Sequence, residues 1–529
     1  MLPPPGQAHL EGSSSTITGR SLAVSSSSSS SAAALFGNAQ GARCATNLLA
    51  AAAAETRYPN KVLALRDMEK CDCGKTTCKT YDNPTATYIL PGYRNSSSAL
   101  RAINLIQTTN ARRDDHENVV VALPGMNVNK LLQSLEVPWG IQDREKDGYL
   151  AGQLAVGKVG GAYLERTTVV ETFGDPLNKR PVDVALRFAS GKFVAFVPSR
   201  ALSRPKEQMP PRRLRRQLLR TMDKTCEARS TITFIVEYFR RPKLINIIAR
   251  RLSFAAGLSR RFPKVEILVN NDGLTDRDAW AHQLLLATKR SGVSAAIFHS
   301  GNIHEVRAYN RMARAATGSH IVFMQDDDVP PPPPVLRHVL GQITHLLCTR
   351  QYRGLALVGG LSGTIEGGPY TGKYSTRPGR RPIPPNFKDK TGRKFMYAPL
   401  VNMGPFAVDR SIFLKVGMFH QGYSCRGEPG IQFDFEFSLR LWKLGYRAGI
   451  MDFKMGYQAS GQASGTRANR FMYHKRKRID TRNQAFYSRM YSGFYKIQGD
   501  YHTRRGTNNP TGVQKLATDA NRELLRRIG

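Results

Sequence analysis

The chain has 529 residues and a formal net charge of +38, because 78 Lys and Arg face 40 Asp and Glu. Hydrophobic residues make up 41% of it, which excludes a wholly disordered chain, and seven cysteines are too sparse for a disulfide-dense scaffold. The length allows about three domains. A positive excess of this size is typical of proteins with an anionic partner, such as nucleic acid, acidic lipid or an acidic polymer, and it also fits a solvated surface.

Residues 1–85 are predicted to form a disordered, low-complexity tail. The segment is Pro-rich at its start, carries serines at 25–31 and then many alanines. Its first 45 residues hold Glu11, Arg20 and Arg43, a composition that fits a plastid-like transit segment or a plain tail. No apolar run reaches the about 18 residues that a membrane-spanning helix needs, and no ordinary signal peptide is visible, so we expect no membrane span.

Three of the cysteines cluster near the end of this tail, at Cys71, Cys73 and Cys78. A structural zinc site needs four ligands at characteristic spacing, and the fourth is missing nearby. A metal knuckle, a disulfide and plain thiols all remain open for this cluster.

Residues 86–225 are predicted to be a small β-containing region followed by a basic linker. Apolar or alternating runs at 119–124, 183–188 and 192–197 favour strands, and 203–224 is basic and punctuated by prolines. The sequence assigns this region no role.

From residue 226 the pattern changes to alternating strands and helices. Strands are predicted at 231–236, 265–269, 294–298 and 320–324, with helical spacing in each interval. This βαβαβαβ order predicts an α/β fold with a mostly parallel sheet flanked by helices. Ligands bind such sheets at the carboxyl ends of the strands.

Carboxylates follow two of these strands. Asp272 ends the second strand, and Asp326, Asp327 and Asp328 follow the fourth. Adjacent carboxylates repel one another unless they are solvated or neutralised. Oxygen ligands suit Mg²⁺ or Mn²⁺, especially when a diphosphate completes the shell. The alternative is a solvated acidic turn before the proline run.

The segment 230–455 resembles the glycosyltransferase family 2-like proteins, which are nucleotide-sugar transferases with the GT-A fold. The matching pieces occur in the family's order, at 233–242, 266–273, 307–318, 321–330, 404–410, 416–419 and 433–446. The resemblance implies a metal-dependent transferase of the hexosyltransferase type. It would move a sugar, by default from a UDP-linked donor, to an acceptor hydroxyl with inversion.

The resemblance also implies roles for particular residues. Asp326 and Asp328, as an Asp-x-Asp motif, would hold Mn²⁺ or Mg²⁺, which acts as a Lewis acid on the leaving diphosphate. Asp434 would be the general base that takes the acceptor's proton. The nucleotide-sugar would be bound by a further set: Glu237, Tyr238, Phe239, Asp272, Arg307, Asp326 and Asp327.

Two positions depart from the family pattern. Asn271 stands where a second acidic residue is common, and Phe433 stands where a Glu usually precedes the base. Around Asp434 the spacing fits a helix or a strand; Gly445 and the family pattern favour the helix. In a strand, Glu436 would share a face with Asp434 and compete for the role of base.

Two other functions compete with an active transferase. The departures allow a catalytically inactive relative that binds nucleotide without turnover. The basic runs at 212–220 and 475–478 allow a nucleic-acid or anionic-polymer binder. Nucleic acid is disfavoured, because these runs lie outside the alternating segment and no aromatic RNA motif or zinc finger is present. Trp442 and His474 are interpreted as core and surface residues rather than as an acceptor subsite and a metal ligand.

The expected organisation is therefore a tail at 1–85, the β-containing region and linker at 86–225, a GT-A-like domain at 226–495 and a basic C-terminal tail at 496–529. The acceptor would be a glycan, protein or lipid, with peripheral contact to an anionic membrane surface or polymer. The resemblance implies a Golgi or membrane-associated location, and the transit-like segment an organelle instead.

Overall fold

The computed structural model describes much of the chain from residue 86 onward. The described residues are 86–93, 99, 116–122, 126–135, 167–173, 184–185, 193–196, 206–207, 231–239, 241–255, 264–272, 276–300, 304–349, 352, 354–360, 362–365, 372–375, 382–389, 392–424, 430–457, 470–495 and 512–528. The predicted tail and the cluster of Cys71, Cys73 and Cys78 lie outside them.

Four parallel strands form the centre of the fold, in the order β9, β6, β7 and β8. They are β6 (Thr231–Tyr238), β7 (Lys264–Asn271), β8 (Ser294–Ser300) and β9 (His320–Gln325). Helices α10 (Pro242–Ala255), α11 (Arg277–Ser291) and α12 (His304–Ala315) connect them in turn. The predicted alternation and the mostly parallel sheet are confirmed.

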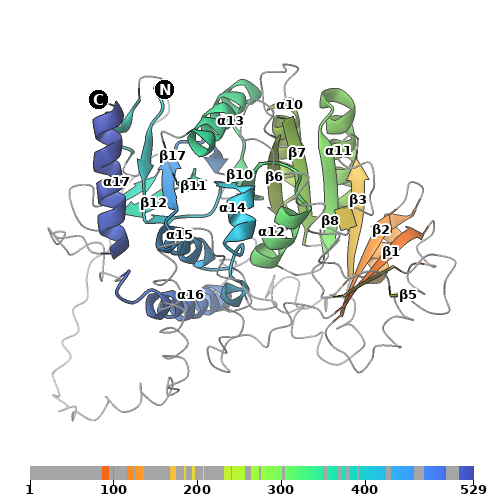
Figure 1. Ribbon diagram of the computed structural model, residues 1–529. Helices are drawn as coiled ribbons and strands as arrows, with labels where there is room; N and C mark the ends of the chain where they lie inside the picture. The colour runs from red at the N-terminus through yellow and green to blue at the C-terminus, as the bar shows by residue number, and fades with distance from the viewer. Residues whose placement is uncertain are drawn as a thin grey trace, which may run out of the picture.

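The sheet extends on both sides of this centre, to thirteen strands among the described residues. Beyond β9 come β16 (Phe406–Asp409), β11 (Leu355–Gly359), β17 (Arg447–Met451) and β14 (Phe395–Tyr397). Beyond β8 come β3 (Thr167–Phe173), β2 (His116–Ala122), β1 (Ala86–Tyr93), β4 (Phe193–Phe196) and β5 (Lys206–Glu207). The N-terminal strands therefore continue the sheet of the alternating segment, through the antiparallel β3–β8 pair (Figure 1).

Short strands form two smaller sheets. β10 (Asp328–Val329) pairs with β18 (Gly456–Tyr457), and β12 (Ser362–Ile365) pairs with β13 (Gly372–Ser375) and β15 (Leu400–Val401). The remaining helices are α5 (Val128–Leu135), α13 (Pro333–Cys348), α14 (Arg410–Lys415), α15 (Phe433–Lys443), α16 (Arg470–Met490) and α17 (Gly512–Ile528), with 3₁₀ turns η3 (Pro385–Phe387) and η4 (Gln421–Tyr423).

An aromatic cluster fixes α15 against the sheet. Phe433 and Phe437, one helical turn apart, have ring centroids 4.8 and 5.2 Å from that of Phe419. Phe419 in turn packs on Phe323 of β9 at 5.2 Å. The helix that the sequence favoured is therefore present, since i and i+4 side chains share a helix face.

Helix α17 packs at the far end of the sheet, on the left of Figure 1. Its Asn521 side chain accepts a hydrogen bond from the Tyr397 N–H at 2.8 Å and donates to the Tyr397 carbonyl at 2.9 Å. Ala517 and Leu524 of the same helix are buried. The basic C-terminal segment thus contributes an edge-covering helix, and covering an edge strand guards its unpaired backbone groups.

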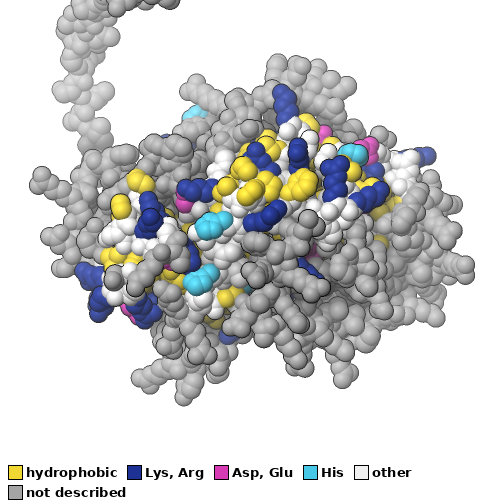
Figure 2. Space-filling model, turned by 90° about the horizontal axis from the view of Figure 1, so that it is seen from above, with side chains coloured by type: hydrophobic (Ala, Val, Ile, Leu, Met, Phe, Trp, Pro, Cys, Tyr) yellow, Lys and Arg dark blue, Asp and Glu magenta, His cyan; other side chains and the backbone are white. Residues whose placement is uncertain are grey.

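The view from above in Figure 2 shows Lys and Arg side chains lying among hydrophobic ones across the described surface. This distribution accords with the net charge of +38. Across the described ranges, no helix combines the length and apolar character needed to span a membrane.

Candidate functional site

The carboxyl ends of β6, β7 and β9 bring the predicted acidic residues to one edge. Parallel pairing places Glu237 of β6 beside Asn270 of β7 and Gln325 of β9. Asp272 follows β7, and its N–H donates to the Tyr238 carbonyl at 3.0 Å. Asp326 begins the turn after β9. The sheet therefore gathers residues that are far apart in the sequence.

Asp326 is tied to the loop after β6. Its Oδ2 accepts from the Phe239 N–H at 2.9 Å, and its Oδ1 lies 3.2 Å from Arg241 Nε. Arg241 also lies 3.7 Å from Asp327 Oδ2. Phe239 thus contributes a backbone donor here, and this loop and the Asp triplet form one unit.

Asp328 faces a different segment. Its Oδ2 accepts from the Gln325 N–H at 2.9 Å. A Cβ added to Gly404 would lie only 3.1 Å from that oxygen, and Gly404 has a φ of +89°. Glycine is favoured at such a φ and lets the backbone approach the carboxylate closely.

Asp434 reaches the same segment from the first turn of α15. Its Oδ2 accepts from the Met403 N–H at 2.7 Å, and its Oδ1 accepts from the Phe435 N–H at 3.0 Å. Met403 therefore contacts the candidate general base, and the adjoining Gly404 lies close to the candidate metal ligand Asp328. The two carboxylates come from segments about 100 residues apart, counted from their sequence numbers.

Glu436 lies in a different environment from Asp434. It is fully buried and paired with Arg440 at 2.6 and 3.0 Å, and it accepts from the Tyr491 hydroxyl at 2.7 Å. Residues two apart on a helix point to different sides. Glu436 therefore joins α15 to the segment after α16, and the structure does not bring it to Met403 with Asp434.

Burial raises the pKa values of the acids at this edge. Burial, with the nearby charges of Asp272 and Glu305, raises the pKa of Glu237 well above its usual range. Burial raises the pKa of Asp326 to about 7, although Arg241 and the Phe239 N–H oppose this, and Asp327 adds to it. Burial likewise raises the pKa of Asp434 to about 6, against the N–H groups of Met403 and Phe435. Perturbed acids clustered in this way are typical of functional sites.

Glu305 and Arg476 belong to the same electrostatic group, and the sequence did not single them out. The Glu305 carboxylate accepts a hydrogen bond from Gln325 Nε2 at 3.1 Å. Burial raises its pKa to about 7; Arg476 opposes this, while Asp326 and Asp434 add to it. The positive charge of Arg476 also opposes the rise in the pKa of Asp434. Glu305 lies on α12 and Arg476 on α16, and only the tertiary fold brings them to the acidic turn. The local spacing of residues in the sequence therefore predicts a site role for neither.

Two carboxylate oxygens at this edge, Glu237 Oε2 and Asp327 Oδ1, are buried without a hydrogen-bond partner among the described residues. Buried polar atoms are usually paired, so exceptions call for a ligand, ion or water. Among the described residues, no three His, Cys, Asp or Glu side chains converge as a metal-binding group. Two aspartates with the rest of the shell from a diphosphate remain compatible with this, because Mg²⁺ is commonly held by one or two carboxylates plus substrate phosphates.

Other predicted residues take mixed positions. Tyr238 is buried, with its ring 5.4 Å from that of Trp280 and its hydroxyl donating to Asp276 Oδ2 at 2.6 Å. Arg307 lies buried on α12. Trp442 is in the core and donates to the Ala398 carbonyl at 3.1 Å, and His474 is exposed, as interpreted from the sequence.

Comparison with known proteins finds no matching family model and no matching curated protein. Three similar solved structures are glycosyltransferases. A mannosyltransferase from Pyrobaculum calidifontis, in complex with GDP-Man and Mn²⁺, has 14% identity and a TM-score of 0.28, over 45% of this chain and 61% of that one. GalNAc-T7 with UDP, GalNAc and Mn²⁺ has 13% identity and a TM-score of 0.28, over 42% of this chain and 43% of that one.

A third similar structure is glucosyl-3-phosphoglycerate synthase from Mycobacterium tuberculosis, in complex with phosphoglyceric acid. It has 15% identity and a TM-score of 0.30, over 55% of this chain and 92% of that one. The chain therefore spans less than two thirds of the first two structures. All three belong to the class that the motifs resemble. TM-scores near 0.3 support no transfer of residue roles, so the proposals below depend on this chain's own contacts.

Proposed function

We propose that this protein is a metal-dependent glycosyltransferase that moves a sugar from a nucleotide-sugar donor to an acceptor hydroxyl. One observation carries the proposal: the Met403–Gly404 backbone joins Asp434 to Asp328 at the carboxyl edge of the parallel sheet. This closeness supports the proposal, because glycosyl transfer needs a base and a metal ligand on either side of one sugar.

The donor side of the proposal uses the acids of the sheet edge. Asp326 and Asp328 would hold Mn²⁺ or Mg²⁺ together with the donor diphosphate. Such an ion supplies Lewis-acid stabilisation of the charge that develops on the leaving group. Asp272 and Glu237 would position the nucleoside, and the buried Glu237 Oε2, which has no hydrogen-bond partner among the described residues, supports this because a ligand could pair with it. The rest of the proposed nucleotide-sugar set is Tyr238, Phe239, Arg307 and Asp327.

The acceptor side of the proposal uses Asp434 as general base. Its carboxylate would take the proton from the acceptor hydroxyl as that oxygen bonds to the anomeric carbon and the bond to the diphosphate breaks. The raised pKa of about 6 suits this role, since a base is most effective with a pKa near the working pH. A single displacement of this kind inverts the anomeric centre. Glu436 is the weaker candidate, because Arg440 and Tyr491 already occupy its oxygens.

The test is a calorimetric titration of the full-length protein with UDP, with and without Mn²⁺. The full chain is needed because β3 and α17 both pack onto the sheet of the proposed domain. We expect binding that depends on Mn²⁺ and falls more than about 100-fold in the Asp326→Asn/Asp328→Asn double variant, beyond the about 10–100-fold cost of losing supporting residues. Asp519→Asn, an exposed position on α17, is the control and should bind like the wild type.

Three outcomes separate the candidate functions. Metal-dependent UDP binding with sugar transfer supports the active enzyme, and binding without turnover supports an inactive relative. GDP is the second nucleotide to try. If neither nucleotide binds, and salt-sensitive binding to a polyanion survives in the double variant, the protein is a basic anionic-polymer binder. For the proposed transferase too, Lys and Arg side chains such as those seen in Figure 2 would contact an anionic membrane surface or polymer.

A further inference from the structure

The segment that follows β7 carries Asp272, and contacts hold it on both of its described sides. On the strand side, Asn271 Nδ2 lies 3.2 Å from His299 Nδ1, on the neighbouring strand β8. On the helix side, Asp276 accepts from the Tyr238 hydroxyl at 2.6 Å, and Arg277 opens α11. The position of Asp272 therefore depends on what fixes Asn271 and Arg277.

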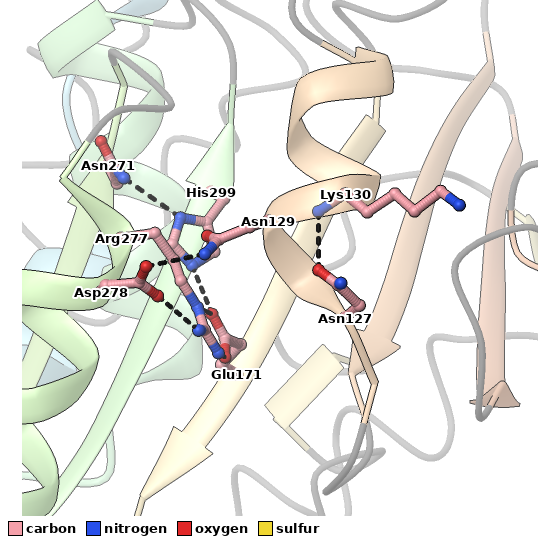
Figure 3. A network of polar contacts seen from close by, with 8 residues as sticks. All are labelled: Asn127, Asn129, Lys130, Glu171, Asn271, Arg277, Asp278 and His299. Carbon is pink, nitrogen blue, oxygen red and sulfur yellow. Dashed lines mark hydrogen bonds and ion pairs between the residues drawn. The ribbon is translucent and has the colours of Figure 1, made fainter.

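One carboxylate, Glu171, contacts the partners on both sides. Its Oε1 lies 2.8 Å from His299 Nε2 and accepts from Arg277 Nε at 2.9 Å. Its Oε2 pairs with a second guanidinium nitrogen of Arg277. Figure 3 shows Glu171 below these two side chains, with Asn271 on the opposite side of the His299 ring. Glu171 thus bridges the two ends of the 271–277 segment.

Glu171 lies on β3, outside the segment that resembles the glycosyltransferases. It pairs with Ile297 in the antiparallel β3–β8 ladder, two residues from His299, so both side chains point to the same face. Its side chain is 9% exposed. Burial would raise the pKa of Glu171, but hydrogen bonds from Arg277 and His299 outweigh it and lower the pKa to about 2. The bridge is therefore a buried, ionised carboxylate with its partners in place.

A second contact from the N-terminal region supports the same helix end. Asn129 of α5 donates to Asp278 Oδ2 at 2.7 Å, and Asp278 also accepts from Arg277 at 2.8 Å. Two separate elements, β3 and α5, therefore contact the first turn of α11 (Figure 3). These side-chain contacts with the first turn of α11 come in addition to the backbone pairing of β3 with β8.

We infer that Glu171 is a positioning residue for the nucleoside: through His299–Asn271 and through Arg277 it holds the Asp272 segment in its binding geometry. This inference rests on the proposed function, since it needs Asp272 to contact the donor nucleoside. It gives the N-terminal strands a task at the donor site. Supporting residues that lock a ligating residue in place commonly contribute about 10–100-fold to affinity or activity.

The experiment compares two ligands on the full-length protein with Mn²⁺ present, UDP and inorganic pyrophosphate. Pyrophosphate reports on the metal and diphosphate subsite alone, and UDP adds the nucleoside. In Glu171→Gln we expect UDP affinity to fall about 10-fold and pyrophosphate affinity to stay within about twofold of the wild type. In a transfer assay, KM for the nucleotide-sugar should rise in proportion while kcat stays, because the base and the metal ligands are unchanged.

Glu523→Gln is the matched control. It makes the same chemical change and removes ion pairs to Arg447 and Arg527, but on α17 at the other end of the sheet. It should leave both affinities unchanged. If Glu171→Gln does not fold, as judged by its thermal unfolding, Arg277→Gln takes its place; that side chain is 23% exposed, and it should lower UDP affinity in the same direction.

The outcomes distinguish the two proposals. If the wild type binds pyrophosphate with Mn²⁺ but no nucleotide, or binds neither, the proposed function and this inference both fail. If the wild type binds UDP and Glu171→Gln binds it equally well, or loses UDP and pyrophosphate alike, the proposed function stands and the positioning role of Glu171 is overturned.

Discussion

Two largely buried carboxylates, Glu171 on strand β3 and Asp326 in the turn after β9, have pKa values shifted in opposite directions. Burial raises the pKa of both groups. At Glu171 the hydrogen bonds from Arg277 and His299 exceed that effect, and the pKa falls to about 2. At Asp326 the Arg241 charge and the Phe239 N–H do not, Asp327 adds repulsion, and the pKa rises to about 7. The charge of Glu171 is thus compensated by its partners, whereas that of Asp326 is compensated only in part, and a cation bound beside Asp326 would favour its ionised form.

The same contrast recurs within α15. Glu436 has Arg440 and Tyr491 on its oxygens, whereas Asp434 has backbone N–H groups and a pKa raised by burial to about 6. Fully paired acids hold elements together, and acids with residual proton affinity are available for chemistry. Substitution of each acid by its amide tests this division.

The largest expected effect is on turnover in Asp434→Asn. Removal of a general base should lower kcat about 10²–10⁴-fold, because the amide cannot accept the acceptor's proton. Metal-dependent UDP affinity should stay within about twofold, since the donor contacts are separate. Steady-state kinetics and calorimetry on one preparation check both values. A variant that transfers sugar at the wild-type rate would remove Asp434 from the mechanism.

The next effect is on folding in Glu436→Gln. Breaking a buried ion pair by removing one partner typically costs about 3–5 kcal/mol, because Arg440 would be left buried without its counter-charge. Denaturant unfolding should show this loss. The double variant Glu436→Gln/Arg440→Met should recover part of it, since no uncompensated charge remains. If Glu436→Gln keeps full stability but loses turnover, the roles of Glu436 and Asp434 are exchanged.

The sequence predicted the parallel centre of the fold because its strands are continuous apolar runs separated by helical spacing. The topology also predicted that Asp272 and Asp326 lie at one edge of the sheet, because the carboxyl ends of parallel strands such as β6, β7 and β9 meet there. The helix at Asp434 was also predicted, and the Phe433, Phe437 and Phe419 packing explains why it forms.

The remaining parts depend on long-range contacts that local patterns do not encode. Glu305 and Arg476 reach the site from α12 and α16, and Gly404 approaches Asp328 through a turn. The pairing of β3 with β8 is likewise a long-range contact. The alternation in residues 86–225 therefore predicted strands but not the strands that they pair with. The domain limits given from the sequence stay predictions.

A smaller effect is expected on the pH dependence of transfer. Asp434 acts as a base only when ionised, and its pKa is about 6. The value of kcat/KM should therefore be level above about pH 7 and fall tenfold per pH unit below about pH 6. Measurement at saturating Mn²⁺ limits the contribution of metal binding. If the residual activity of Asp434→Asn shows the same fall of kcat/KM at acid pH, a group other than Asp434 causes that fall.

The smallest effect concerns the acid stability that Glu171 confers. Its folded-state pKa of about 2 lies below the usual 4.5, so the ionised form is favoured by folding. The stabilisation is therefore fully present above about pH 4.5 and is lost as the pH falls towards 2. Between pH 6.5 and 3.5, the difference in unfolding free energy between wild type and Glu171→Gln should shrink by about 1 kcal/mol, since one pKa unit corresponds to about 1.4 kcal/mol. Denaturant unfolding at both pH values checks this, with Glu523→Gln in parallel. A difference that stays constant over that range would show that Glu171 is not the ionised bridge on which the division between paired and unpaired acids depends.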